Sequence, residues 1–293
     1  MKLLITDLDN TLYDWVTYFA KSFNAMVKDL ALQLSVSEEK LLEEFKTVHQ
    51  RYGNSEHPFA MFELPSVQSA FPNASRGELL LKLESPLSAF KRAREEHLRL
   101  YEGVAETLER LKNEGLIIVA HTEAVAVHAY YRLLRLNVLS CFRHIYALEG
   151  NVEPHPDPAR GAELMPPPDL IREIPRSERK PNPELLRDIC NREGVSVEDT
   201  FYVGDSLTRD VSMAKTAGVT AIWAKYGTRY DPRLWDSLVR VTHWTEDDVA
   251  REASLRENME TILPDYTIES FAELLDIVQA DVNDEHVVER SHQ

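Results

Sequence analysis

Five short apolar segments rich in β-branched residues alternate along this chain with stretches of helical periodicity. They are Leu3–Leu8, Gly115–Thr122, His144–Gly150, Thr200–Ser206 and Val219–Gly227. Nearly continuous apolar runs of this length are typical of strands buried on both faces of a parallel sheet. The helical patterns between them end at glycines, which supply the left-handed residue that terminates a helix. The alternation predicts a doubly wound α/β fold built on a parallel sheet.

The alternation is interrupted between the first and second predicted strands. From residue 14 to residue 100 the pattern is mostly helical, and no comparable apolar strand lies within it. We expect this block to form a second, helical domain inserted after the first strand and seated over the edge of the sheet. Residues 1–13 and 101–279 then form the α/β core.

Two segments of the predicted core depart from the regular pattern. The stretch from Pro154 to Pro183 holds nine of the fifteen prolines, which predicts a long irregular excursion, an insertion at about residues 151–179. Residues 229–263 are polar and helical in pattern, and they form a second addition. A final packed helix is expected near residues 266–279, starting at Thr267 or Ser270, followed by a frayed polar tail at residues 280–293.

The charge and cysteine content narrow the class of partner and the compartment. The 293 residues carry a formal net charge of −16, so long-range repulsion argues against nucleic acid or an anionic membrane as the partner. A local lysine or a metal can still reverse the sign inside one pocket. No apolar run approaches the ~20 residues of a membrane span, and we expect no secretory leader. With only Cys141 and Cys190, far apart in sequence, we expect free thiols and a cytoplasmic protein.

Two carboxylates, Asp7 and Asp9, stand at the end of the first predicted strand. Ligands of open α/β sheets bind outside the carboxyl ends of the strands, so both residues lie where a site would form. Alternate residues of a strand point in opposite directions, so Asp9 must lie past the strand, where the backbone turns. Two close carboxylates are tolerated when a cation joins them or when one keeps its proton. A simple turn or capping pair would explain an isolated D-x-D as well.

Three further positions carry polar groups suited to the same place. The second predicted strand ends on Thr122, Lys180 stands just before a helix, and the fourth strand ends on Gly204-Asp205, with Asp210 five residues on. Each alone has an ordinary explanation as a solvated charge or a helix cap. Together they would supply a nucleophile, an acid, a hydroxyl donor, a cation and metal ligands.

This ordered set resembles the haloacid dehalogenase superfamily, in its capped phosphatase branch with a helical C1-type cap after the first motif. The D-x-D-x-T motif of the family is Asp7-Leu8-Asp9-Asn10-Thr11, and the strand ending in Thr or Ser is the run that ends on Thr122. The motif lysine is Lys180 in KPNP, and the G-D motif with its later Asp is Gly204-Asp205 with Asp210. The resemblance covers residues 1–13 and 100–228 and the last helix.

The resemblance implies a magnesium-dependent mechanism on a doubly wound core. Asp7 would attack phosphorus to form an aspartyl-phosphate, and Asp9 would protonate the departing oxygen and later deprotonate the attacking water. Mg²⁺ would bind the Asp7 carboxylate, the Asp9 carbonyl and Asp205. Thr122 and Lys180 would hold the phosphoryl oxygens. The remaining motif residues are assigned to the substrate side of the loop or to support of the site: Asn10, Thr11, Gly204, Ser206 and Asp210.

The acid at position 9 favours phosphoryl chemistry over dehalogenation, because a halide leaves without a proton. We expect a phosphatase acting on a small phosphorylated metabolite, since a closing cap excludes water and macromolecules. A phosphomutase acting on a sugar phosphate uses the same residues, and a catalytically silent protein of this fold would keep them too. A phospho-accepting receiver domain also combines such residues, but it lacks a long helical insertion between the first two motifs. The substrate and the oligomeric state are left open.

Overall fold

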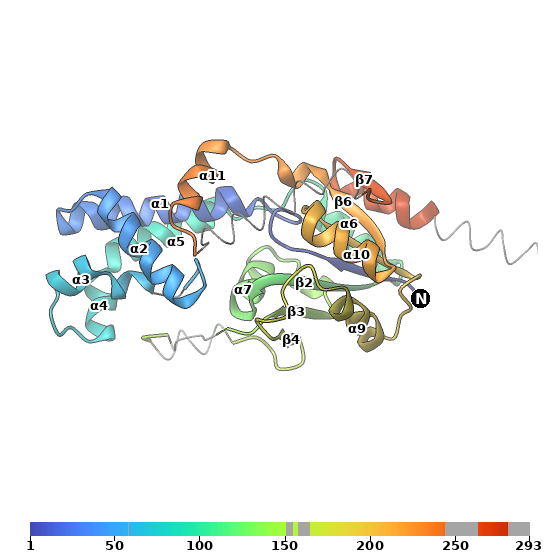
Figure 1. The fold of residues 1–293 in the computed structure, drawn as a ribbon, viewed down its shortest axis with the longest axis horizontal. Coiled ribbons are helices and arrows are strands. Elements are labelled where there is room, and N and C mark those ends of the chain that lie inside the picture. The colour runs from blue at the N-terminus through green and yellow to red at the C-terminus, as the bar shows by residue number, and fades with distance from the viewer. Residues whose placement is uncertain (58, 151–154, 158–164, 244–262, 281–293) are drawn as a thin grey trace, which may run out of the picture.

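The structure is a computed structural model that describes residues 1–57, 59–150, 155–157, 165–243 and 263–280. Over these ranges the chain forms a seven-stranded parallel sheet and a mainly helical lobe beside it (Figure 1). The predicted doubly wound α/β fold with a helical insertion after the first strand is confirmed. Among the described helices, none combines the length and the apolar character that crossing a membrane requires.

The first strand of the chain lies at the centre of the sheet. The strands are β1 (Leu3–Thr6), β2 (Ile117–Val125), β3 (His144–Leu148), β4 (Ile171–Ile174), β5 (Thr200–Gly204), β6 (Thr220–Ala224) and β7 (Tyr266–Ile268). Their order is β4-β3-β2-β1-β5-β6-β7, so β1 pairs with β2 on one side and with β5 on the other. The strand order therefore reverses between β1 and β5, the point at which open α/β sheets form a ligand crevice.

Helices cover both faces of the sheet. On one face lie α6 (Val104–Asn113), α7 (Ala126–Arg135) and a helix at residues 274–280, and on the other lie α9 (Pro183–Glu193) and α10 (Ser212–Ala217). Along β1, Leu4 joins the first apolar cluster whereas Leu3 and Ile5 join the second, as the alternation of a strand requires. Burial on both faces explains why the strands are almost continuously apolar.

The helical lobe, residues 14–100, contains a long helix packed against a second one. Its elements are α1 (Trp15–Leu34), α2 (Glu38–Tyr52), the 3₁₀ turn η1 (Ala60–Glu63), α3 (Pro65–Ala70), α4 (Arg76–Lys82) and α5 (Glu84–His97). Asp14 begins α1 by accepting a hydrogen bond from the backbone N–H of Thr17 at 2.8 Å. The apolar side of α1, including Phe19 and Phe23, belongs to the same buried cluster as Leu4 of β1. The lobe and one face of the sheet thus share one continuous core.

The Pro-rich segment differs from its prediction as a wholly irregular excursion. Residues Ile171–Ile174 form β4, an edge strand paired with β3, because that pairing satisfies backbone groups between the prolines. The segment also reaches the helical lobe. Arg176 donates a hydrogen bond to the carbonyl of Tyr52 at 3.1 Å, and the ring of His155 packs edge-on against Phe59. Residues 151–154 and 158–164 lie outside the described part.

The C-terminal region agrees with its prediction in part, because the chain turns into the last helix at Ser270, one of the two predicted starts, and not at Thr267. Instead of starting a helix at Thr267, residues Tyr266–Ile268 form β7 beside β6, and Ser270 caps the 3₁₀ turn η6 (Phe271–Glu273) that leads into the helix at 274–280. The second addition contributes α11 (Pro232–Val239), which lies against α1 of the helical lobe (Figure 1). Residues 244–262, which include most of the predicted amphipathic run, and the tail from residue 281 lie outside the described residues.

Candidate active site

Three carboxylates converge where the strand order reverses. Asp7 follows β1, Asp205 follows β5, and Asp210 lies in the helical turn Leu207–Val211 just beyond it. One carboxylate oxygen from each residue lies within 4.8 Å of the others. Because β1 and β5 are parallel neighbours, their carboxyl ends meet at one edge of the sheet, which brings the first and fourth motifs together.

Lys180 lies among these carboxylates with its side chain buried. Its Nζ donates to Asp7 Oδ1 at 2.6 Å and to Asp210 Oδ1 at 2.9 Å, and the hydroxyl of Tyr202 also donates to Asp210 Oδ1. Two residues later, Asn182 accepts from the backbone N–H of Leu185 and so begins α9. Burial lowers the pKa of Lys180, but Asp210 and Asp7 outweigh that effect and hold it well above its usual range. The lysine is therefore a fixed cation.

The carboxylates nevertheless exceed the cations at this point. Burial raises the pKa of Asp7 to about 7 against the opposing effect of Lys180, with Asp210 and Asp9 raising it further. Burial, followed by the charges of Asp210 and Asp7, raises the pKa of Asp205 well above its usual range. One ammonium thus faces three crowded carboxylates, and oxygen ligands of this kind are those that Mg²⁺ prefers. The donor set fits a divalent cation.

The loop after β1 fixes Asp7 and joins it to the helical lobe. Thr11 donates from Oγ1 to Asp7 Oδ2 at 3.2 Å. Asn10 adopts a left-handed backbone conformation, and its side-chain oxygen accepts from the backbone N–H groups of Trp15 and Val16 at the start of α1. Thr11 therefore orients the carboxylate of Asp7, whereas the side chain of Asn10 ties the loop to α1.

Two glycines permit close backbone approaches around the site. A Cβ at Gly204 would lie 2.4 Å from the Asp210 carboxyl, which folds back to accept from the backbone N–H of Ser206. A Cβ at Gly227, in the 3₁₀ turn Lys225–Thr228 after β6, would lie 1.9 Å from the carbonyl oxygen of Asn10. Sequence reasoning placed Gly227 only at the end of a predicted strand, because no local signal reveals which backbone it meets.

Thr122 lies on the neighbouring strand, buried, beyond the level at which β1 ends. Thr6 is paired with Ala120, and the β2–β3 register becomes irregular after Thr122. The hydroxyl oxygen of Thr122 accepts from the backbone N–H of Ala124 at 3.1 Å. Its hydroxyl hydrogen can therefore be donated to another acceptor, such as a phosphoryl oxygen.

Asp9 is held by residues that sequence reasoning missed. Arg132 of α7 donates from Nη1 to Asp9 Oδ1 at 2.9 Å, and the hydroxyl of Tyr13 donates to the same oxygen at 2.6 Å. Arg132 also forms an ion pair with Glu56, which lies in the loop after α2, and Trp15 donates from Nε1 to Glu56 Oε1 at 3.3 Å. The Arg132 side chain is only 1% exposed. The pKa of Asp9 is raised, mainly by burial. The charge of Arg132 lowers this pKa, and the charge of Glu56 raises it further.

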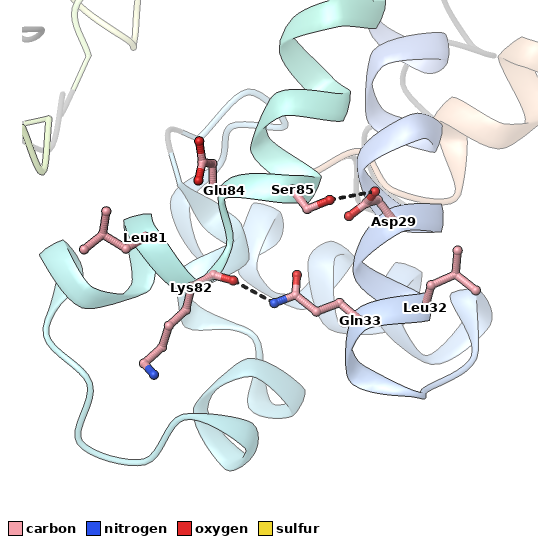
Figure 2. Close-up of a pocket in the computed structure, with 7 residues that line it drawn as sticks. All are labelled: Asp29, Leu32, Gln33, Leu81, Lys82, Glu84 and Ser85. Atoms are coloured by element: carbon pink, nitrogen blue, oxygen red, sulfur yellow. Dashed lines mark hydrogen bonds between the residues drawn. The ribbon is translucent and has the colours of Figure 1, made fainter.

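A separate hollow of about 550 Å³ lies at the far end of the helical lobe. Figure 2 shows its lining, in which Ser85 donates to Asp29 and Gln33 donates to the carbonyl of Lys82. Its α1 residues stand near the C-terminal end of that helix, whereas Trp15 beside Glu56 stands at the N-terminal end. At 1.5 Å per residue, α1 spans about 30 Å, so the hollow is not part of the site.

Comparison with known families gives two matches. A model described as haloacid dehalogenase-like hydrolase matches residues 1–218, and a HAD-hydrolase-like model matches residues 177–274. Together they include every motif residue described above.

Two curated relatives match more than half of the chain. A glyceraldehyde 3-phosphate phosphatase from Methanopyrus kandleri is 26% identical over 95% of this chain and 97% of its own. A phosphoglycolate phosphatase from Mannheimia succiniciproducens is 28% identical over 61% of this chain and 58% of its own. Among solved structures, a 2-haloacid dehalogenase from Pseudomonas syringae superposes with a TM-score of 0.57 at 18% identity, covering 96% of this chain and 99% of that one. At that identity the last likeness supports the fold alone.

Proposed function

The chain belongs to the haloacid dehalogenase-like hydrolases, as a phosphatase of that superfamily, and we propose that it hydrolyses a small phosphorylated metabolite through an aspartyl-phosphate on Asp7. The observation that carries this proposal is the position of Lys180 between Asp7 and Asp210, with Asp205 beside them. This arrangement lies at the point where the strand order reverses. The chemistry needs a nucleophile, a fixed cation and metal ligands, and this edge of the sheet offers all three.

Asp7 is the proposed nucleophile. Thr11 and Lys180 each hold one of its carboxylate oxygens, so the side chain is fixed before substrate arrives. Attack on phosphorus forms the new O–P bond, breaks the ester bond and releases the alcohol oxygen. Asp9, whose pKa is raised by burial, carries the proton for that oxygen and then takes one from the attacking water. Water then releases phosphate and restores Asp7.

Asp7 and Asp205, with the backbone carbonyl of Asp9, are the proposed ligands of Mg²⁺, and Asp210 supports them. When bound, the ion would offset the charge of the carboxylates and of the phosphoryl oxygens. Lys180 and Thr122 are the proposed donors to the phosphoryl oxygens. Gly204 and Ser206 support the position of Asp210, and Asn10 and Thr11 form the loop on the substrate side.

We further propose that residues 14–100 act as a cap that limits the site to small substrates, on a core of residues 1–13 and 101–279. Arg176 and α11 attach the two insertions, residues 151–179 and 229–263, to that cap. Glyceraldehyde 3-phosphate, whose alcohol portion is uncharged, and phosphoglycolate, whose alcohol portion carries a carboxylate, are named for the two relatives and are the first metabolites to compare. The cytoplasmic location remains a prediction.

The test is phosphate release from para-nitrophenyl phosphate and these metabolites, with Mg²⁺, with chelator, and with Asp7→Asn. Asp29→Asn makes the same change at the distant hollow and serves as the control. We expect loss of release with chelator and with Asp7→Asn, and no loss with Asp29→Asn. Release by rigorously purified Asp7→Asn would exclude the mechanism. In a further arm a sugar phosphate is supplied, and isomerised product in place of free phosphate would instead identify a mutase.

A further inference from the structure

We propose that Glu56 makes this site selective for phosphate monoesters with an uncharged alcohol portion, and that it excludes esters whose alcohol portion carries a carboxylate. The inference rests on the proposed function, because it concerns the leaving group that Asp9 would protonate. It is carried by the contacts among Asp9, Arg132 and Glu56.

The first step is the position of the leaving group. An acid that protonates the departing oxygen must lie within hydrogen-bond reach of it. Asp9 Oδ1 is bonded to Arg132, and Arg132 is paired with Glu56 in turn. The alcohol portion of a substrate therefore lies close to the guanidinium of Arg132 and to the carboxylate of Glu56.

The second step is the charge that the alcohol portion would meet. A buried arginine with a free face is a strong receptor for a carboxylate, because its N–H groups match the two oxygens. Here Nη1 is bonded to Asp9 and Nη2 to Glu56. With Asp9 protonated the remaining Arg132–Glu56 pair is neutral, and with Asp9 ionised the three groups are net negative. In neither state is a positive charge left over for a substrate carboxylate.

Glu56 is held firmly as a carboxylate. Its side chain is 14% exposed, and Trp15 donates to it from Nε1. Burial raises the pKa of Glu56, but the charge and hydrogen bond of Arg132, together with the hydrogen bond from Trp15, outweigh that effect, so its pKa lies below its usual range. His128 adds a hydrogen bond to the backbone carbonyl of Glu56 at 2.9 Å. Since burial lowers the pKa of His128, that ring is neutral and supplies no compensating charge.

Two other cations in the described part of the site, Lys180 and Arg209, are paired with carboxylates. Lys180 is bonded to Asp7 and Asp210. Arg209, in the turn after β5, is paired at 3.0 Å with Glu123, the neighbour of Thr122. A substrate carboxylate that paired with Lys180 or Arg209 would have to displace a carboxylate partner. Arg94 of α5 stacks its guanidinium over the ring of Tyr131, 4.2 Å from the centroid, and within the described ranges it makes no hydrogen bond or ion pair to Asp9.

The experiment compares glycerol 3-phosphate with 3-phosphoglycerate, which differ at one carbon, a CH₂OH in the first and a carboxylate in the second. We expect the wild-type kcat/KM to favour glycerol 3-phosphate, and Glu56→Gln to shift the ratio toward 3-phosphoglycerate by about 10-fold or more, as expected for removing a nearby charge. Glu56→Asp keeps the charge and should keep the preference.

The control is Glu63→Gln, which makes the same change seven residues further on. Glu63 bonds to Tyr52, Arg51 and His57, and among the described residues it makes no hydrogen bond or ion pair to Asp9 or Arg132, so the ratio should not move. Equal turnover of the two esters by the wild type, a wild-type preference for 3-phosphoglycerate, or a Glu56→Gln ratio within twofold of wild type would each overturn the inference.

Binding separates failure of this inference from failure of the proposed reaction. Calorimetric dissociation constants for both esters are measured in the Asp7→Asn background, with and without Glu56→Gln. A binding preference that follows residue 56 would uphold the inference even if the wild type released no phosphate. Equal binding of the two esters, or binding of neither, would reject it.

Discussion

The Nζ atom of Lys180 lies 2.6 Å from Asp7 Oδ1, although 173 positions separate the two residues in the chain. The same nitrogen lies 2.9 Å from Asp210 Oδ1. Three motifs that are distant in sequence therefore share one buried ion-pair network. Removing one partner of such a network destabilises the folded protein, because the remaining charges stay buried without it.

Replacing Lys180 by methionine should therefore damage both stability and activity. We expect the free energy of unfolding at pH 8 to fall by about 3 kcal/mol or more, because Asp7 and Asp210 lose their cation. Turnover should fall about 10²-fold or more with the loss of a donor to the phosphoryl group. Urea unfolding and phosphate release measure the two effects. Lys215→Met, which breaks the exposed pair with Asp265, is the control and should cost at most about 1 kcal/mol.

Asp205→Asn should stabilise the metal-free protein. The pKa of Asp205 is raised by burial and by two neighbouring carboxylates, so its ionised form opposes folding above that pKa. Removing this crowded buried charge should add about 1–3 kcal/mol to the free energy of unfolding at pH 8, the usual cost of an uncompensated buried polar group. The measurement is urea unfolding with chelator and with Mg²⁺. The wild type should gain more from Mg²⁺ than the variant does, and equal gains would contradict the assignment of Asp205 as a ligand.

Gly227→Ala should loosen the loop after β1. The new Cβ would meet the carbonyl oxygen of Asn10 at 1.9 Å, which no side-chain rotation relieves. We expect a loss of about 1–3 kcal/mol, as for other overpacked sites. Gly77→Ala in α4 is the matched control, because nothing lies within 4 Å of its new Cβ and alanine favours a helix. Thermal melting of both variants tests this; equal melting temperatures would show that the Gly227 contact is unimportant.

His49 should make stability depend on pH between about 6.5 and 4. Burial lowers the pKa of His49 from 6.5 to about 4, while its Nδ1 bonds to the carbonyl of Val241 at 2.5 Å. The unfolded chain then binds a proton at a pH where the folded protein does not. Above pH 6.5 His49 does not lower the free energy of unfolding. As the pH falls toward 4, the free energy of unfolding decreases by about 3 kcal/mol in total because of this group.

Urea unfolding at pH 7 and at pH 4.5 measures this loss. His49→Gln should reduce the difference between the two conditions, whereas His97→Gln, at a partly exposed position of α5, should leave it as in wild type. An unchanged pH dependence in His49→Gln would assign the loss to other groups.

The five predicted strands are present because their signal is local. Each is a run of apolar residues buried on both faces, and that pattern is readable in isolation. The two strands that were missed, β4 and β7, are edge strands with one neighbour each. Arg172 and Glu173 occupy half of β4, and β7 has only three residues. Neither strand therefore has an apolar run long enough to predict it from the sequence. Both are defined by hydrogen bonds to distant strands.

The residues of the candidate site divide in the same way, into those with a local sequence signal and those defined by distant contacts. Asp7, Lys180 and Asp205 were predicted because their spacing places them beside strand or helix ends. Arg132 and Glu56 were not, since an arginine on an amphipathic helix usually lies in solvent. One signal was present: Arg132 lies next to Leu133 and three residues after Ala129, on the buried side of α7. Only the packing of the helical lobe against α7 shows that the arginine meets two carboxylates there.

The central place of β1 has a consequence for synthesis on the ribosome. Its neighbours on either side begin at Ile117 and Thr200, so a nascent chain exposes β1 for much of translation before both edges of this strand can pair. The intervening helices of residues 14–100 emerge first and form through local contacts, which close faster than contacts between distant strands. Until β5 emerges, β1 offers an unpaired apolar edge, the kind of surface that chaperones bind.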